Sequence, residues 1–185
     1  MHFSKCIYLA LLLFMSSTGL FSQQAAGIFP DMEGEALQLA IVQAFKPGQV
    51  LSYRDARDTM YALIDNHRDT VYGLYSNHGV YLPEGVDPSV HLFQDGAAGG
   101  INCEHVWPRS KGAKYGPPKS DMHHLFPTRV SVNQARGNYP FGEVEDTQTR
   151  RWFYQSFERN SLPAASSIDD YSELGSDVFE PREAM

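Results

Sequence analysis

Apolar residues recur at helical spacing in residues 34–46, and this pattern predicts an amphipathic helix. Pro47 and Gly48 follow directly and are expected to end it, because this pair is a strong turn signal. A second helix is predicted to begin after Ser52, a good N-cap residue, with Asp55 three positions later as its capping partner. The spacing of apolar positions predicts that its buried face carries Ala56, Met60, Tyr61, Leu63 and Ile64.

Later segments carry shorter patterns. Strands are predicted at 70–75 and 101–107, which are rich in β-branched and apolar residues, and a short helix is predicted at 130–137, ended by Gly137. The other segments are rich in Gly and Pro or only weakly patterned: loops are predicted at 76–100 and 111–119, a strand within the aromatic segment 141–157, and no clear element in the acidic segment 162–185.

The chain has 185 residues, which is the length of one domain. Its 42% apolar and 20% charged residues allow a packed core and exclude global disorder. With only two cysteines, Cys6 and Cys103, the chain is neither a disulfide-rich scaffold nor a protein with an all-cysteine zinc site.

The N-terminus has the three-part pattern of a secretory signal peptide, predicted here over residues 1–22. The apolar run Ile7–Met15 follows a short segment with one lysine and is too short to span a bilayer, which takes about 20 apolar residues. We therefore expect residues 23–185 to form a secreted or periplasmic domain that does not associate with a membrane after cleavage. Cys6 would leave with the signal, so that Cys103 has no partner within the chain.

Charge is distributed unevenly along the chain. The formal net charge is −7, which argues against a partner bound by bulk positive charge. Residues 101–140 nevertheless carry six basic and two acidic side chains, a local net charge of +4, whereas the rest of the chain carries −11. Any polyanion is therefore expected to bind at this stretch, where several histidines also lie.

The same stretch contains residue types that suit phosphodiester hydrolysis. His105 can accept a proton from water, because the unperturbed pKa of histidine is near 6.5. Glu104 and Asn133 offer oxygen ligands, which suit Mg²⁺ or Ca²⁺ better than Zn²⁺. Arg136 lies one helical turn after Asn133 and could reach either a phosphate or a buried acid.

Three segments, in this order and spacing, resemble the endonuclease I family of secreted and periplasmic bacterial nucleases, part of the His-Me finger or ββα-metal group. They are Glu104-His-Val-Trp-Pro108, Ser120-Asp-Met-His-His-Leu-Phe-Pro-Thr128 and Asn133-Gln-Ala-Arg-Gly-Asn-Tyr-Pro-Phe-Gly142. Weaker similarity extends from about Gly34 to Glu183. Relatives usually continue into a further helix, whereas this chain ends at Met185, which suggests a truncated C-terminal end.

The resemblance implies an α+β fold: a mainly helical domain with a small β-sheet and a ββα-metal active-site motif. It implies that His105 is the general base and that Glu104 and Asn133 bind one divalent cation, Mg²⁺ first, with Ca²⁺ or Mn²⁺ as alternatives. His124 is expected to orient the site, and Asp121 to support a histidine or a turn.

The resemblance also implies residues that hold the substrate. Arg136 matches a family arginine, and we assign it and Arg109 to the catalytic group. Arg109 is the only arginine between the base and the Asp121 segment, where the family holds the cleaved phosphate; Lys111 or Lys114 could take that place. The expected partner is DNA, with RNA as the alternative, and the protein is expected to be a monomer.

Three function classes remain open at this stage. The first is a metal-dependent endonuclease of little sequence specificity. The second is a zinc hydrolase built from Glu104, His105, His123 and His124, although the chain has no zinc-motif spacing. The third is a secreted polyanion-binding protein derived from a nuclease that has lost its activity.

Overall fold

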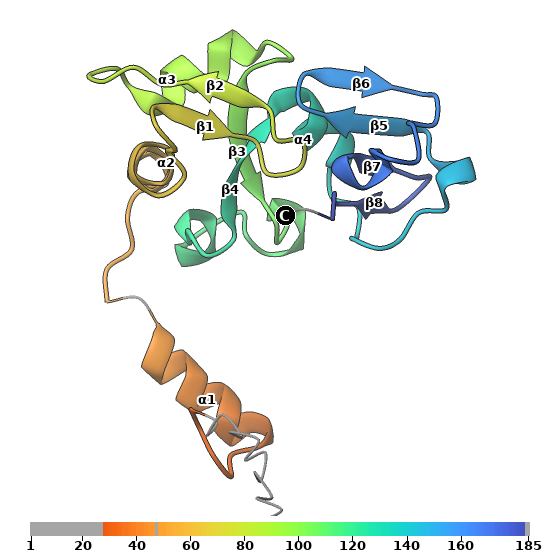
Figure 1. Cartoon of the computed structure of the whole chain (residues 1–185). Coiled ribbons are helices and arrows are strands. Elements are labelled where there is room, and N and C mark those ends of the chain that lie inside the picture. Colours follow the sequence, from red (N-terminus) through yellow and green to blue (C-terminus); the bar gives the residue numbers. More distant parts are fainter. Residues whose placement is uncertain (1–27, 47, 184–185) are drawn as a thin grey trace, which may run out of the picture. The chain divides into compact units, whose positions relative to one another are not determined.

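The computed structural model describes residues 28–46 and 48–183, and the chain divides into two compact units, residues 1–46 and 47–185. The first unit contains α1 (Gly34–Phe45), which confirms the predicted helix (Figure 1). None of the side chains of α1 is buried, and Phe45 stacks edge-on against Phe29 with ring centroids 6.2 Å apart. The predicted signal peptide lies outside the described residues. Among the described helices, none is long and apolar enough to cross a bilayer.

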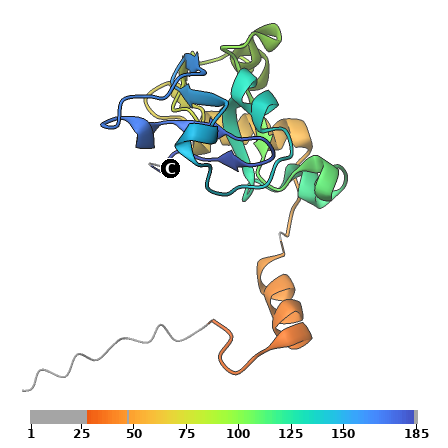
Figure 2. The same cartoon turned by 90° about the vertical axis from the view of Figure 1, so that its right-hand side faces the viewer.

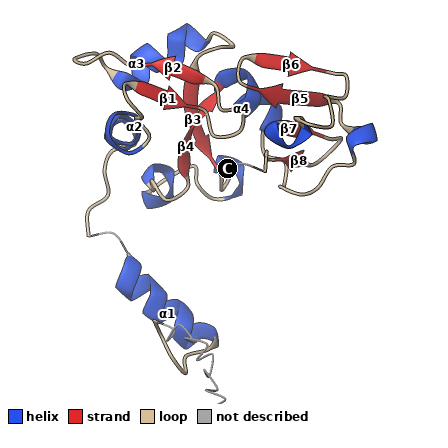
Figure 3. Ribbon diagram, in the orientation of Figure 1, coloured by secondary structure: helices blue, strands red, loops and turns tan. Residues whose placement is uncertain are grey.

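In its described residues, 48–183, the second unit combines three short α-helices with eight short strands (Figure 3). The helices are α2 (Tyr53–Thr59), α3 (Pro88–Phe93) and α4 (Val130–Arg136). The strands are β1 (Thr70–Tyr72), β2 (Gly79–Tyr81), β3 (Ile101–His105), β4 (Leu125–Arg129), β5 (Arg151–Tyr154), β6 (Phe157–Arg159), β7 (Ser172–Leu174) and β8 (Phe179–Glu180). They form two antiparallel pairs, β1–β2 and β3–β4, and a four-stranded antiparallel sheet in the order β6-β5-β7-β8.

The prediction of a mainly helical domain with one small sheet is wrong. The described chain has three separate sheets, and helices do not dominate it, although helices and strands are both present as expected of an α+β protein. The segments predicted as loop or left unassigned contain β2, α3, β7 and β8. These elements have two to six residues, too few for a hydrophobic period to stand out in the sequence.

The start of α2 is confirmed, and its predicted buried face is confirmed only in part. Ser52 caps the helix by accepting a hydrogen bond from the backbone N–H of Asp55 at 3.1 Å. After Thr59 the helix continues as a single π-helical turn, Met60–Ile64, which buries Met60 but leaves Leu63 and Ile64 exposed. A π-turn has a wider spacing than the α-helical one, so the apolar face expected from an α-helical period is displaced at its end.

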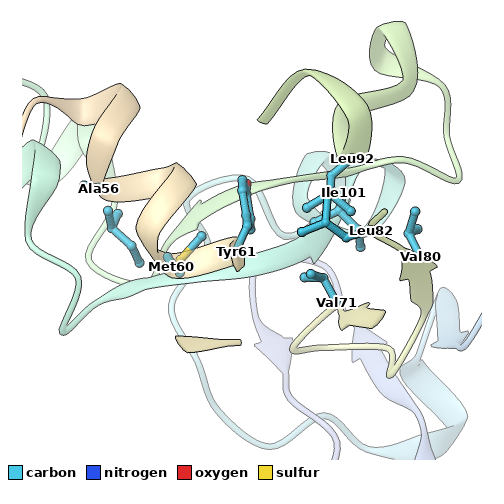
Figure 4. Close-up of a cluster of buried hydrophobic side chains, with 9 residues drawn as sticks. Ala56, Met60, Tyr61, Val71, Val80, Leu82, Leu92 and Ile101 are labelled. Atoms are coloured by element: carbon cyan, nitrogen blue, oxygen red, sulfur yellow. The ribbon is translucent and has the colours of Figure 1, made fainter. Parts of the chain in front are cut away.

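The first hydrophobic cluster lies where α2 and its π-turn, α3, the β1–β2 hairpin and the β3–β4 pair meet (Figure 4). Its fully buried side chains include Tyr61, Val71, Leu92 and Ile101. Since Ile101 begins β3, this packing holds the strand that ends at His105.

A second hydrophobic cluster joins α4 to the four-stranded sheet, whose blue strands lie beside α4 in Figure 1 and are turned toward the viewer in Figure 2. Val132 of α4 packs with Phe153 and Phe179, and Tyr75 completes the cluster with its ring centroid 5.0 Å from that of Phe179. Arg129, at the end of β4, pairs with Glu158 at 3.3 Å. The C-terminal sheet therefore supports the helix that follows β4.

A pH-dependent contribution to stability is expected from Glu173 of β7, which is buried beside other acids. Burial, and then repulsion by Glu180 and Asp146, raises the pKa of its carboxyl to about 7 from a usual value of 4.5, against the hydrogen bond from Thr149. The folded state thus holds this proton more tightly than the unfolded chain does. The stability that protonation provides is complete below about pH 4.5 and is lost as the pH rises through 7.

Glu173→Gln is therefore expected to raise the melting temperature at pH 8 and to change it little at pH 5, because glutamine keeps an acceptor for Thr149 without the charge. Thermal unfolding at both pH values measures this difference, with the exposed Glu84→Gln as the matched control. Equal shifts at both pH values would contradict the assigned pKa.

Candidate active site

The candidate site is built on a β-β-α unit in the middle of the second unit (Figure 1). Strands β3 and β4 pair antiparallel, with His105 opposite Leu125, and α4 follows β4 without an intervening loop. A cavity of about 280 Å³ opens at the end of β3. Its lining includes five of the residues predicted from the sequence: Glu104, His105, Arg109, Asn133 and Arg136.

Glu104 is a buried carboxylate held by two donors. Its Oε1 atom accepts a hydrogen bond from the Tyr75 hydroxyl at 2.8 Å and pairs with Arg136 Nη1 at 3.0 Å. Burial raises the pKa of the Glu104 carboxyl, and the charge of Arg136 and the Tyr75 hydrogen bond oppose that rise. Both contacts use the same oxygen, so neither of them occupies Oε2.

Arg136 is a buried residue that is already engaged by the protein. It donates from Nη2 to the carbonyl of Val106 at 2.9 Å and from Nη1 to that of His105 at 3.3 Å, and its guanidinium lies 4.6 Å from the centre of the Phe141 ring. Of the two partners left open by the sequence, a phosphate or a buried acid, the structure shows the acid, Glu104. Arg136 thereby connects α4 to the end of β3.

His105 is the last residue of β3, and its ring is oriented by a backbone carbonyl. Its Nε2 lies 3.1 Å from the carbonyl oxygen of Lys119. A carbonyl only accepts, so Nε2 carries the proton and Nδ1 is the basic nitrogen of the neutral ring. Burial lowers the pKa of His105 to about 4, with the Lys119 carbonyl opposing and the charges of His124 and Arg109 adding to the fall. The ring is therefore neutral at pH 7, which is the form that can accept a proton.

Adjacent residues of a strand point to opposite faces, yet both Glu104 and His105 line the cavity. The end of the strand at His105 resolves this conflict, since the chain there leaves the β3–β4 ladder and turns at Pro108.

Asn133 lies on the first turns of α4 and faces the same cavity. Its Nδ2 donates to Asn102 Oδ1 at 2.7 Å and to the carbonyl of Cys103 at 3.3 Å. These bonds fix the amide, and none of the hydrogen bonds found among the described residues uses its Oδ1. An amide oxygen thus remains available on a side chain that lines the same cavity as Glu104.

The predicted substrate-binding residues are separated by the structure. Arg109 is exposed in a 3₁₀ turn and lines the cavity. Lys111 and Lys114 are exposed outside this lining, and the ammonium of Lys114 lies 5.2 Å from the Tyr115 ring centre. Arg109 is therefore the better placed of the three to contact a phosphate in this cavity.

Asp121 and His124 lie beside the site rather than in its lining. Asp121 accepts hydrogen bonds from the backbone and Nδ1 of His123, which lower its pKa although partial burial opposes them. His124 Nε2 donates to the carbonyl of Pro118 at 2.7 Å, and its ring centroid lies 5.6 Å from that of His105. His124 thus packs against His105, whereas Asp121 supports the neighbouring histidine.

The four side chains of the alternative zinc site do not assemble. Within residues 28–46 and 48–183, no three His, Cys, Asp or Glu side chains converge in a way that could hold a metal ion. His123 is 85% exposed in its pair with Asp121 and does not line the cavity that Glu104 and His105 line. Glu104 and Asn133, by contrast, line one cavity and offer a carboxylate oxygen and an amide oxygen.

Three contributors to the site were not identified from the sequence. Tyr75 supplies the hydroxyl on Glu104, Asn102 holds the amide of Asn133, and Lys119 orients His105 through its backbone carbonyl. The only signal for Tyr75 was the weak family similarity of the segment around it, and a backbone carbonyl leaves no signal at all.

Comparison with known proteins places the chain among the nucleases. A family model described as Endonuclease I matches residues 34–185. The chain therefore belongs to the endonuclease I family, as its three motifs indicated.

Two curated relatives match a shorter part of the chain. Extracellular ribonucleases of Bacillus amyloliquefaciens and of Bacillus subtilis (strain 168) are each 49% identical to it over 49 residues, which is 25% of this chain and 17% of each relative. The match thus spans about a sixth of the length of those proteins. No solved structure matches the chain significantly.

Proposed function

We propose that the protein is a secreted, metal-dependent endonuclease of little sequence specificity, with the active-site architecture of a His-Me finger. One observation carries the proposal. A neutral, oriented histidine and two oxygen ligands from different elements line a single cavity on a β-β-α unit. The substrate is nucleic acid, DNA or RNA.

His105 is the general base in this proposal. With Nε2 committed to the Lys119 carbonyl, Nδ1 takes a proton from the water that attacks the phosphorus. Its lowered pKa keeps the ring in the neutral form at pH 7, in which Nδ1 carries a free electron pair. Arg109, which shares the cavity, contacts a non-bridging oxygen of the phosphate and stabilises the charge that develops there.

The donor set fits a hard divalent cation. Glu104 Oε2 and Asn133 Oδ1 are the oxygens left over by the surrounding hydrogen bonds, and Mg²⁺ commonly takes one or two protein oxygens and keeps waters. When bound, such a cation supplies positive charge for the phosphate and the leaving oxygen. Arg136 and Tyr75 hold the carboxylate in position for it.

Secretion is supported by the apolar N-terminal segment and by the names of the two extracellular relatives. The relatives are ribonucleases, which makes RNA a substrate to test beside DNA.

Plasmid DNA and a long RNA incubated with the purified protein are expected to be cleaved in Mg²⁺, to be left intact in excess EDTA, and to be cleaved again when Mg²⁺ is restored. His105→Ala purified in the same way serves as the control for contaminating nucleases. Binding of nucleic acid without cleavage would favour a polyanion-binding protein instead. If the protein still cleaves in excess EDTA, the reaction does not depend on a metal ion and this part of the proposal is wrong.

A further inference from the structure

A second and larger cavity, of about 530 Å³, adjoins the candidate active site and is lined by residues of α2, α3 and β3. The two cavities share Cys103 and Arg109, so they lie next to each other along β3. Aromatic rings and cations characterise the lining of the second cavity, with one acid among them: Tyr53, Tyr61, Phe93, Arg57, Arg109 and Asp95.

We propose that this cavity is a base-binding subsite, which holds the unpaired base of a nucleotide next to the cleaved phosphate. The protein then prefers single-stranded nucleic acid over duplex, because a base inside a duplex cannot enter the cavity without leaving its stack. This inference rests on the nuclease function proposed above and adds what the site recognises beside the phosphate. Its volume falls in the range of small-ligand pockets, about 300–1,000 Å³.

Phe93 provides an exposed aromatic face that is held in place. The residue is 43% exposed, and the loop that follows it approaches it closely at Gly96 and Gly100. A Cβ atom at Gly96 would lie 3.2 Å from the Phe93 ring, and one at Gly100 only 2.4 Å from the Phe93 carbonyl oxygen. Glycines at both positions let the loop approach, so the ring is oriented before a base arrives, and little side-chain entropy is lost on stacking.

The charges around the cavity fit a nucleotide. Arg57 and Lys119 lie 4.8 and 4.9 Å from the centre of the Tyr53 ring. Arg109 lies between the two cavities, where a phosphate that links the bound base to the catalytic centre would pass. Aromatic faces beside cations are the combination that binds single-stranded nucleic acid with little sequence preference.

The carboxylate of Asp95 in the lining favours a base, and not the phosphate backbone, as the group bound inside this cavity. A carboxylate repels a phosphate but accepts hydrogen bonds from the amino groups of bases. Asp95 and Asn102 line the same cavity, so they can meet the polar edge of a base that stacks on Phe93.

The test measures binding of a short fluorescent single strand and of a blunt duplex to full-length protein carrying His105→Ala, which prevents cleavage. Adding Phe93→Ala is expected to weaken single-strand binding about 5- to 150-fold, the effect of losing one stacked base, and to leave duplex binding unchanged. Phe93→Leu is expected to show the same loss while it preserves the packing on Gly96. The matched control is Phe157→Ala, at an exposed phenylalanine of β6, which is expected to bind as the parent does.

Further substrates separate the base from the rest of the strand. A strand without bases is expected to bind weakly to the parent protein. It is expected to bind equally weakly to the Phe93→Ala protein, because it has no base to lose from the cavity. Equal losses on RNA and DNA strands are expected, and a loss confined to RNA would overturn the assignment by placing a 2′-hydroxyl in the cavity. If the wild-type protein cleaves nucleic acid but Phe93→Ala binds single strands normally, the subsite is wrong and the nuclease function stands; if the wild-type protein does not cleave, the nuclease function itself fails.

Discussion

His105→Ala is expected to lower the rate of phosphodiester cleavage about 10²–10⁴-fold, the usual cost of removing a general base. The expectation follows from the ring's orientation. Its Nε2 proton is held by the Lys119 carbonyl, so Nδ1 is the only nitrogen that can accept a proton from water. The assay is initial-rate cleavage of plasmid DNA and RNA at saturating Mg²⁺.

Two controls accompany this measurement. His67→Ala removes an exposed histidine outside the cavity lining and is expected to cleave as the wild type does. Added imidazole is expected to restore part of the activity of His105→Ala, because a small base can occupy the vacated position. Near-wild-type cleavage by His105→Ala would show that another group is the base.

Arg136→Met is expected to destabilise the fold by about 3–5 kcal/mol, since it leaves the Glu104 carboxylate buried without its partner. It also removes the hydrogen bonds that Arg136 gives to the carbonyls of His105 and Val106. Urea unfolding followed by circular dichroism measures the loss. Glu104→Gln in the same chain is expected to recover part of it, because the buried charge is then absent.

A surface pair provides the comparison for this prediction. Arg151 pairs with Glu158 on the four-stranded sheet, where the arginine side chain is 39% exposed. Arg151→Met is expected to cost at most about 1 kcal/mol, as exposed ion pairs usually do. Equal losses for Arg136→Met and Arg151→Met would mean that the Glu104–Arg136 pair is not the internal support described above.

The elements that the sequence predicted well are those with a strong local signal. The Ser52 cap and the end of α4 at Gly137 depend on residues within one turn of the helix, and both are confirmed. Strands β7 and β8 have no such signal, because each is a short segment whose stability comes from partners distant in the sequence. The four-stranded sheet therefore could not be predicted, and the estimate of helix content was wrong as a result.

The candidate site shows the same division. Glu104, His105 and Asn133 stand in motifs, and the structure brings them to one cavity. Arg136 also belongs to a motif, but the sequence of the motif does not show whether this arginine binds a phosphate or a carboxylate of the protein. That choice depends on its burial beside Glu104. Tyr75 was missed since its contact with Glu104 joins residues 29 positions apart and has no counterpart in local spacing.

Two of the six basic residues in the positively charged stretch, residues 101–140, form ion pairs inside the protein. Arg129 and Arg136 are buried and pair with Glu158 and Glu104, so they do not contribute to a surface for nucleic acid. The charge counted from the sequence therefore overestimates that surface. Arg109 is the exposed arginine of this stretch in the cavity lining.

The most direct test of the account is a Mg²⁺ titration of cleavage by the wild type, Asn133→Ala, Asn133→Asp and His105→Ala. Asn133→Ala loses an oxygen ligand and is expected to need more Mg²⁺ for half-maximal activity, with cleavage recovering at high Mg²⁺. Asn133→Asp keeps an oxygen and is expected to need no more Mg²⁺ than the wild type. His105→Ala is expected to stay inactive at every Mg²⁺ concentration while calorimetry shows that it still binds the ion. Recovery of His105→Ala at high Mg²⁺, with no change in the Mg²⁺ requirement of Asn133→Ala, would contradict the assignment of base and ligand.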